Sequence, residues 1–174
     1  MMPKNRLRKL LNENKPTIGT HFSCTWPNLV EIIGNSNHFD YAEFTGQYGP
    51  YTLHDLEHLA RACEITEMDA MIKIDQEPRT FIATRAIQAG FTALLFADCR
   101  SSQDVKRCVQ SVKLIPQGGI NGYQFGRMMG YGMVRGKTVS IKDYVAYIDD
   151  LVIAIMIETK SLVDDIEEAL SIPG

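Results

Sequence analysis

The chain has 174 residues, of which 45% are hydrophobic, 9% aromatic and 22% charged, a composition typical of a globular domain that folds without disulfides or a structural metal. Its 18 basic and 21 acidic residues give a net charge of −3, and no long segment carries one sign of charge. Because neutralising phosphates requires clustered lysine and arginine, nucleic acid is not expected as a partner.

The sequence predicts a cytoplasmic protein with no membrane segment. No window reaches the ~18 consecutive apolar residues of a membrane span. The polar residues 12–15 follow the basic start directly and leave no apolar core for a signal peptide. The four cysteines (Cys24, Cys63, Cys99 and Cys108) form no C-x-x-C pair, so reduced thiols fit better than a disulfide framework or a zinc site.

Short apolar runs alternate with helical patterns along the chain. Strands are expected at residues 17–23, 41–45, 70–74, 92–97 and 152–157. Helices are expected at residues 27–33, 53–66, 79–89, 101–112, 144–151 and 161–170. This alternation predicts an α/β fold with parallel strands and right-handed crossovers.

The alternation breaks between residues 115 and 143, a stretch that holds seven of the 13 glycines. A long loop inside a compact domain is usually functional or disordered. The aromatic residues Tyr123, Phe125 and Tyr131 favour an ordered lid or rim over disorder. We expect one domain over residues 1–174, with this glycine-rich loop inside it.

Five β-α units allow two architectures. One is a self-contained, doubly wound sheet of the flavodoxin type. The other is the first part of an eight-stranded barrel, which typically needs about 250 residues. The doubly wound fold should show a phosphate-binding loop after its first strand, but residues 23–28 contain no glycine. That difference lowers the weight of a nucleotide-binding module without eliminating it.

Polar residues follow every predicted strand, where the working residues of parallel α/β folds lie. One of them stands out, because Glu158 comes directly after the unbroken apolar run 152–157. An isolated carboxylate there is costly unless it is paired or bound to a metal. A hard divalent cation, held by carboxylates and substrate oxygens, would account for it.

Five motifs follow one another in an order that resembles a known enzyme family. They are Ile18-Gly19-Thr20, Glu43 to Pro50, Gln76-Glu77-Pro78, Ala93 to Phe96 and Ile155 to Thr159. Together they are similar to the HpcH/HpaI aldolases, over residues 7–170 of this chain but only about two thirds of the family's barrel. The resemblance implies a (β/α)8 barrel of TIM type, of which this chain supplies about the first five β-α units.

The resemblance also implies a chemistry. Members of the family cleave a 4-hydroxy-2-oxo acid to pyruvate and an aldehyde, using a divalent metal that is commonly magnesium or manganese. The cation chelates the pyruvate half and stabilises its enolate as a Lewis acid. Glu158 matches the family's metal-binding glutamate. Lys73 lies within one residue of the arginine that contacts the keto oxygen, and lysine can supply the charge but not the planar fork.

The catalytic base departs from the family's pattern. After Gly46, a position expected to bind substrate, the family carries a Glu-His pair whose histidine is the base, but this chain carries Gln47-Tyr48. Gln47 is still expected to bind substrate. Tyr48 can act as the base only beside a cation that lowers its pKa, which is ordinarily about 10. His21 is a second candidate for the base, because it is expected to face inward from its strand, on the same side as Gly19.

The sequence thus favours a metal-dependent carbon–carbon lyase of the aldolase type. The alternative is a catalytically silent relative or fragment that binds a small carboxylate or acts through assembly. An independent nucleotide-binding module is a distant third. Because an incomplete barrel exposes unpaired strand edges, we also expect a homo-oligomer or poor solubility.

Overall fold

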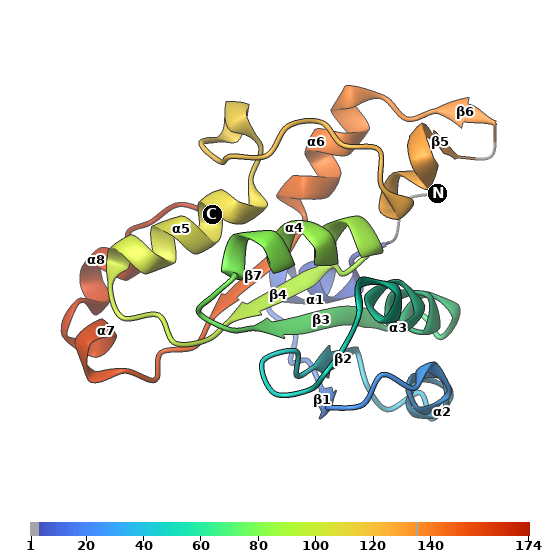
Figure 1. The fold of residues 1–174 in the computed structure, drawn as a ribbon, viewed down its shortest axis with the longest axis horizontal. Coiled ribbons are helices and arrows are strands. Elements are labelled where there is room, and N and C mark those ends of the chain that lie inside the picture. The colour runs from blue at the N-terminus through green and yellow to red at the C-terminus, as the bar shows by residue number, and fades with distance from the viewer. Residues whose placement is uncertain (1–3, 135) are drawn as a thin grey trace.

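Five parallel strands form the centre of the protein in the computed structural model, which describes residues 4–134 and 136–174 (Figure 1). The strands are β1 (Gly19–Phe22), β2 (Tyr41–Phe44), β3 (Asp69–Ile74), β4 (Ala93–Phe96) and β7 (Val152–Ile155). They lie side by side in the order β1-β2-β3-β4-β7, and every pairing is parallel.

This strand order distinguishes the two architectures. Each strand pairs with the one that precedes it in the sheet along the chain, whereas a doubly wound sheet reverses its order at a switch point. The predicted α/β fold is therefore confirmed, and its order is that of consecutive barrel strands. Within the described residues the sheet is open, because β1 and β7 each have a single strand neighbour.

Helices follow the strands as predicted. They are α2 (Pro27–Asn35), α3 (Leu53–Ile65), α4 (Arg79–Ala89), α5 (Ser102–Val112), α6 (Ile141–Asp149), α7 (Lys160–Asp164) and α8 (Ile166–Leu170). The single helix expected at 161–170 is divided at Asp165, whose carboxylate accepts a 2.6 Å hydrogen bond from the Ser102 N–H at the start of α5. None of the described helices combines the length and apolarity of a membrane span.

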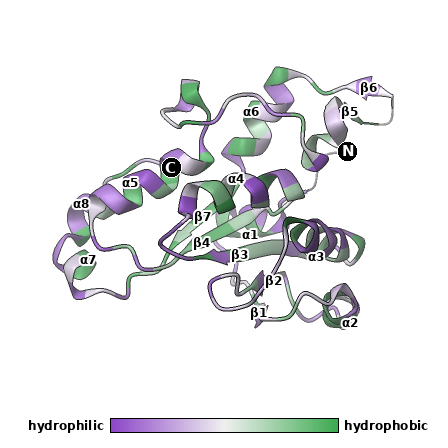
Figure 2. Cartoon of the chain, viewed as in Figure 1, coloured by the Kyte–Doolittle hydropathy of each residue, from purple (hydrophilic) through white to green (hydrophobic). Residues whose placement is uncertain are grey.

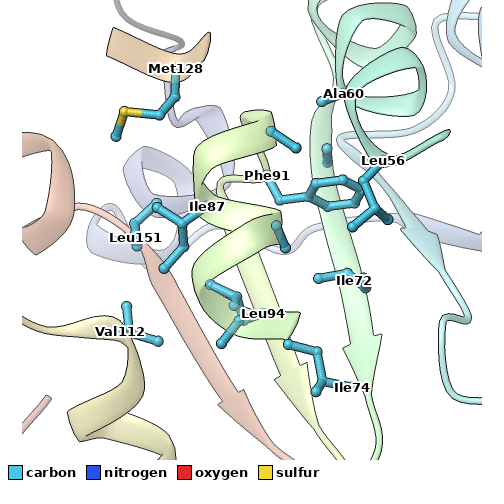
Figure 3. Packing of buried hydrophobic residues seen from close by; sticks show 14 of the residues in the cluster. Leu56, Ala60, Ile72, Ile74, Ile87, Phe91, Leu94, Val112, Met128 and Leu151 are labelled. Atoms are coloured by element: carbon cyan, nitrogen blue, oxygen red, sulfur yellow. The ribbon is translucent and has the colours of Figure 1, made fainter. Parts of the chain in front are cut away.

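The main core lies between the sheet and helices α3, α4 and α5. Figure 3 shows Ile72 and Leu94 of the strands packed beneath α4, with Leu56 and Phe91 beside them. These four side chains are at most 1% exposed. Apolar residues accordingly concentrate in the central strands, whereas the helices alternate between hydrophilic and hydrophobic positions (Figure 2). This outer-face core positions the ends of the strands that carry the candidate site.

The opposite face of the sheet, here called the inner face, is covered near the start of its strands by α1 (Arg6–Asn12). Leu7 of α1 is 3% exposed and packs in one cluster with the inner-face residues Met71, Ala93 and Val152. The Leu7 N–H also donates a 2.6 Å hydrogen bond to the buried Asp69 carboxylate. Helix α1 therefore closes the amino end of the sheet and leaves the carboxyl end open.

The segment between residues 115 and 143 contains short elements of its own. They are the 3-10 helices η1 (Ile115–Gln117) and η2 (Arg127–Gly132), and the hairpin strands β5 (Met133–Val134) and β6 (Lys137–Thr138). Tyr123 packs edge-on against both Phe125 and Tyr144, with ring centroids 4.9 and 4.7 Å away. This aromatic cluster attaches the segment to α6.

The contact between α1 and the inner face predicts a strong effect of Leu7→Ala. Removing the buried side chain should lower the free energy of unfolding by about 2–4 kcal/mol, because packing is lost and a cavity remains. Urea denaturation measures the change. Leu11→Ala is the matched control on the same helix, since Leu11 is 42% exposed, and should change stability by about 0.5 kcal/mol or less. Equal effects of the two substitutions would contradict the assigned role of α1.

Candidate active site

Three polar side chains connect the carboxyl ends of separate strands. Gln47 follows β2, Asp98 follows β4 and Glu158 follows β7. The Gln47 Nε2 donates a 2.8 Å hydrogen bond to the Asp98 Oδ2, and the Asp98 N–H donates a 2.9 Å hydrogen bond to the Glu158 Oε1. We call these residues the strand-end cluster. Two carboxylates and one amide thus meet at the open edge, where parallel α/β folds bind their ligands.

The strand-end cluster shows two local features of a binding site. Asp98 has a φ of 54°, a left-handed conformation that is uncommon for residues other than glycine and that costs about 1 kcal/mol or more. The Gln47 Oε1 is buried and accepts no hydrogen bond from the described part of the chain. A buried acceptor of this kind normally has a hydrogen-bond partner. The Gln47 Oε1 is therefore an acceptor that a ligand could use.

The cluster provides oxygen donors suited to a hard cation. Asp98, Glu158 and the Gln47 Oε1 supply carboxylate and amide oxygens, and magnesium sites commonly use one or two carboxylates completed by water and substrate. Among residues 4–134 and 136–174, no three histidine, cysteine or acidic side chains lie close enough to hold a metal by themselves. The donor set therefore fits a cation that shares its coordination with a substrate.

Lys73 and Tyr48 form a second polar pair at the same edge. The Lys73 Nζ donates a 3.2 Å hydrogen bond to the Tyr48 hydroxyl and lies 4.8 Å from the centre of its ring. Lys73 is 8% exposed, whereas Tyr48 is 69% exposed. Tyr48 thus lies beside a cation. An ammonium group has three donors, and no other hydrogen bond from the Lys73 side chain occurs within the described residues.

Residues 45 and 46 hold the end of β2 against its neighbours. The Thr45 hydroxyl donates a 2.8 Å hydrogen bond to the carbonyl oxygen of Phe22 on β1. A Cβ atom at Gly46 would lie 3.1 Å from the carbonyl oxygen of Lys73 on β3. Glycine therefore permits this close approach, and both residues position the loop that carries Gln47 and Tyr48.

The inner face carries two more ionisable side chains beneath this edge. His21 of β1 and Glu43 of β2 are in register across the parallel ladder. His21 is exposed at the edge of the sheet, and Glu43 is half-buried. Burial raises the pKa of the Glu43 carboxyl above its usual range, and the charges of His21 and Lys73 oppose that shift only in part.

A pair of thiols lies immediately behind the strand-end cluster. The Cys99 and Cys108 sulfurs are 3.6 Å apart, and both residues are fully buried. A hydrogen bond from Cys108 lowers the pKa of Cys99, whereas that same bond and burial raise the pKa of Cys108. The Thr159 hydroxyl donates a 2.8 Å hydrogen bond to the carbonyl oxygen of Cys99. This contact connects the segments that carry Asp98 and Glu158.

A cavity of about 1000 Å³ lies at the other end of the sheet, between α1, the end of α3 and η2. Its lining includes Asp69 and Thr92 but none of the candidate site residues. Several of the charged groups that line it are already paired, as in the Arg127–Glu64 and Arg6–Asp40 ion pairs. We therefore locate the candidate active site at the carboxyl edge and not in this cavity.

The structure brings most of the predicted site residues to this edge. Gly46, Gln47, Tyr48, Lys73 and Glu158 all lie there, while His21 stands lower on the inner face. Asp98 and Glu43 were not among the predicted site residues. The position of Asp98, directly after an apolar strand, is a signal that could have identified it. Glu43 could have been identified as a charged residue at an inward-facing position of a predicted strand.

Comparisons with known proteins confirm the resemblance to HpcH/HpaI aldolases that the motifs indicated. The chain is 23% identical over 173 residues to the 2-keto-3-deoxy-L-rhamnonate aldolase of Escherichia coli K12, covering 98% of this chain and 61% of that relative. No protein-family model matches the sequence.

Solved structures show the same fold. The HpcH/HpaI aldolase of Desulfitobacterium hafniense DCB-2 superposes with a TM-score of 0.79 at 21% identity, over 98% of this chain and 62% of that structure. An HpcH/HpaI aldolase/citrate lyase family protein of Burkholderia cenocepacia J2315 gives 0.83 at 20% identity, over 98% and 66%. The chain thus has the fold of about three fifths of an aldolase of this type.

Proposed function

We propose that the protein is a metal-dependent carbon–carbon lyase that cleaves a 4-hydroxy-2-oxo acid to pyruvate and an aldehyde. The observation that carries the proposal is the strand-end cluster, where the hydrogen-bonded Gln47, Asp98 and Glu158 lie at the edge that also carries Lys73. The similarity to a 2-keto-3-deoxy-L-rhamnonate aldolase supports a substrate of this class. The four thiols, none of them in a disulfide, support a cytoplasmic location.

Glu158 and Asp98 are the residues that would hold a magnesium or manganese ion, with Gln47 as an additional oxygen donor. A bound divalent cation supplies Lewis-acid stabilisation of negative charge on the oxo acid. Glu158 is exposed on its open side, so a ligand can approach it. The Asp98 N–H donates a hydrogen bond to one of the two carboxylate oxygens of Glu158. This bond orients the Glu158 carboxylate, so that little entropy is lost when a ligand binds.

Lys73 supplies fixed positive charge for the substrate. Its side chain is nearly buried, its Nζ is held by the Tyr48 hydroxyl, and its remaining donors are available for a keto or carboxylate oxygen. A preorganised donor in a partly desolvated site stabilises developing negative charge better than water does. Tyr48 orients this ammonium group, while Gly46 and Gln47 form the wall on which the substrate lies.

One observation supports a second candidate function. The end of β2 carries Gln47 and Tyr48 where the HpcH/HpaI aldolases carry a Glu-His pair, so it offers neither a carboxylate nor an imidazole as a base. This arrangement favours a catalytically silent relative that binds a small carboxylate through Lys73. The two functions differ in turnover but not in binding.

Turnover separates the two functions. The unsubstituted protein with Mg²⁺ or Mn²⁺ should release pyruvate from a panel of 4-hydroxy-2-oxo acids, in a lactate dehydrogenase-coupled assay. EDTA should abolish the release, and added metal should restore it, because the cation stabilises the charge that develops on the oxo acid. Pyruvate binding by calorimetry without turnover on any member of the panel would instead identify the silent carboxylate-binding protein.

Glu158→Gln tests the proposed metal site directly. Exchanging the carboxylate for an amide should raise the Kd for Mn²⁺ roughly tenfold or more, since the loss of a single supporting group already costs 10- to 100-fold in many sites. Titration calorimetry or Mn²⁺ electron paramagnetic resonance measures the Kd. The control is Glu167→Gln, because Glu167 is exposed on α8 away from the cluster. An unchanged affinity in Glu158→Gln would remove this residue from the site.

We also propose that the protein assembles into a homo-oligomer through its sheet edges. Each edge strand, β1 and β7, has one strand neighbour within the described residues, and unpaired strand edges pair readily with another chain. Sedimentation velocity should show a species larger than 19.6 kDa. A soluble monomer across a wide range of concentrations would contradict this assembly.

A further inference from the structure

The inner face of the first three strands carries charge where a barrel interior is ordinarily apolar. His21, Glu43 and Lys73 come from β1, β2 and β3, and all three have inward parity. Leu95 and Ala154 occupy the corresponding positions on β4 and β7, in register with Lys73. Barrel interiors are filled chiefly by branched apolar side chains, so a charged row on three adjacent strands is a departure that packing does not explain.

Glu43 is the member of this row that lies between the other two. It is opposite His21 on one side, and on the other side it pairs with Met71, two residues before Lys73 on the same face of β3. Its side chain makes no hydrogen bond and no ion pair to any of the described residues, and it is only half-buried. The carboxylate therefore lies near the charges of His21 and Lys73, is partly exposed, and is not engaged with another described residue.

The two other carboxylates of the site and the tyrosine are already hydrogen-bonded. Asp98 and Glu158 are hydrogen-bonded in the strand-end cluster, and the Tyr48 hydroxyl accepts its hydrogen bond from Lys73. His21 lies on the edge strand and is exposed to solvent. Glu43 is thus the partly desolvated carboxylate of the inner wall that has no internal partner to displace before it accepts a proton.

We propose that Glu43 is the general base of the reaction, an inference that rests on the proposed function. The Glu43 carboxylate accepts the proton of the substrate's 4-hydroxyl group. The electron pair of that O–H bond forms the aldehyde C=O, the C3–C4 bond breaks, and its electron pair passes to C3 to give the enolate of pyruvate. The proton then returns to C3. All atoms of the oxo acid are recovered in pyruvate and the aldehyde, and no co-reactant is required.

The surroundings of Glu43 suit this role. A general base works best when its pKa lies near the operating pH, and burial raises the pKa of Glu43 toward that range while His21 and Lys73 limit the rise. Because the base must be ionised to act, activity should fall as the pH decreases through this pKa. The titratable groups that share the inner face of β1, β2 and β3 with Glu43 are His21 on β1, Tyr41 on the same strand, and Asp69 and Lys73 on β3.

The test compares Glu43→Gln, Glu43→Asp and His21→Gln with the unsubstituted protein in Mg²⁺. Glu43→Gln should lower kcat by about 100-fold or more, the usual contribution of a general base, and should remove the acid limb of the pH–rate profile. Glu43→Asp should retain that limb and part of the activity. The Kd for pyruvate, by calorimetry, should stay within about threefold in both variants. Glu168→Gln on α8 is the control and should match the unsubstituted protein.

The possible failures are distinguishable. Turnover by Glu43→Gln with an unchanged acid limb overturns the assignment of Glu43 and leaves the lyase function standing. Loss of turnover and of the acid limb in His21→Gln, with Glu43→Gln active, assigns the base to His21 instead. Absence of metal-dependent turnover in the unsubstituted protein defeats the proposed function, and the role of Glu43 with it.

Discussion

The parallel hydrogen-bonded ladder from β1 to β7 determines where chemistry can take place in this protein. Because all five strands run in one direction and in chain order, their carboxyl ends meet at a single edge. Gln47, Asp98 and Glu158 are far apart in sequence, yet that edge brings them within hydrogen-bonding distance. The apolar packing of α3, α4 and α5 on the outer face fixes the ladder, and α1 closes its other end. The site thus depends on contacts that contain no site residue.

Alternation of apolar runs and helical patterns was sufficient to predict the five strands of the sheet and the helices that follow them. Each of the five strands was expected within a few residues of its position. The signal is strongest in β4, whose continuous apolar run is typical of a strand covered on both faces. The break at Asp165 could not be predicted, because it comes from a hydrogen bond to Ser102, 63 residues away in the chain. Likewise, the short helices and the hairpin in the glycine-rich segment are held by contacts such as Tyr123 with Tyr144, which no local pattern contains.

The sequence predicted site residues that lie at the ends of strands, but not the hydrogen bonds that join those residues. Glu158 was identifiable because a carboxylate directly after six apolar residues is costly without a partner. The partner itself, the Asp98 N–H, depends on a left-handed backbone conformation that the sequence does not reveal. Lys73 was expected near a substrate oxygen, but its hydrogen bond to Tyr48 requires the loop after β2 to lie against the end of β3. The inward parity of Glu43 can be read from the sequence, but its position between His21 and Lys73 follows only from the strand register.

The distribution of charge on the inner face suggests why the site is asymmetric. The wall formed by β1, β2 and β3 carries His21, Glu43 and Lys73, whereas β4 and β7 present Leu95 and Ala154 at the level of Lys73. The two carboxylates of the strand-end cluster follow those apolar strands and lie above them. A substrate anion positioned by Lys73 would therefore have its charged end near this ammonium group, and its carbon chain against the apolar side chains of β4 and β7. Such an arrangement can orient an oxo acid in one direction, because a reversed substrate would place its anionic end away from Lys73 and against apolar side chains.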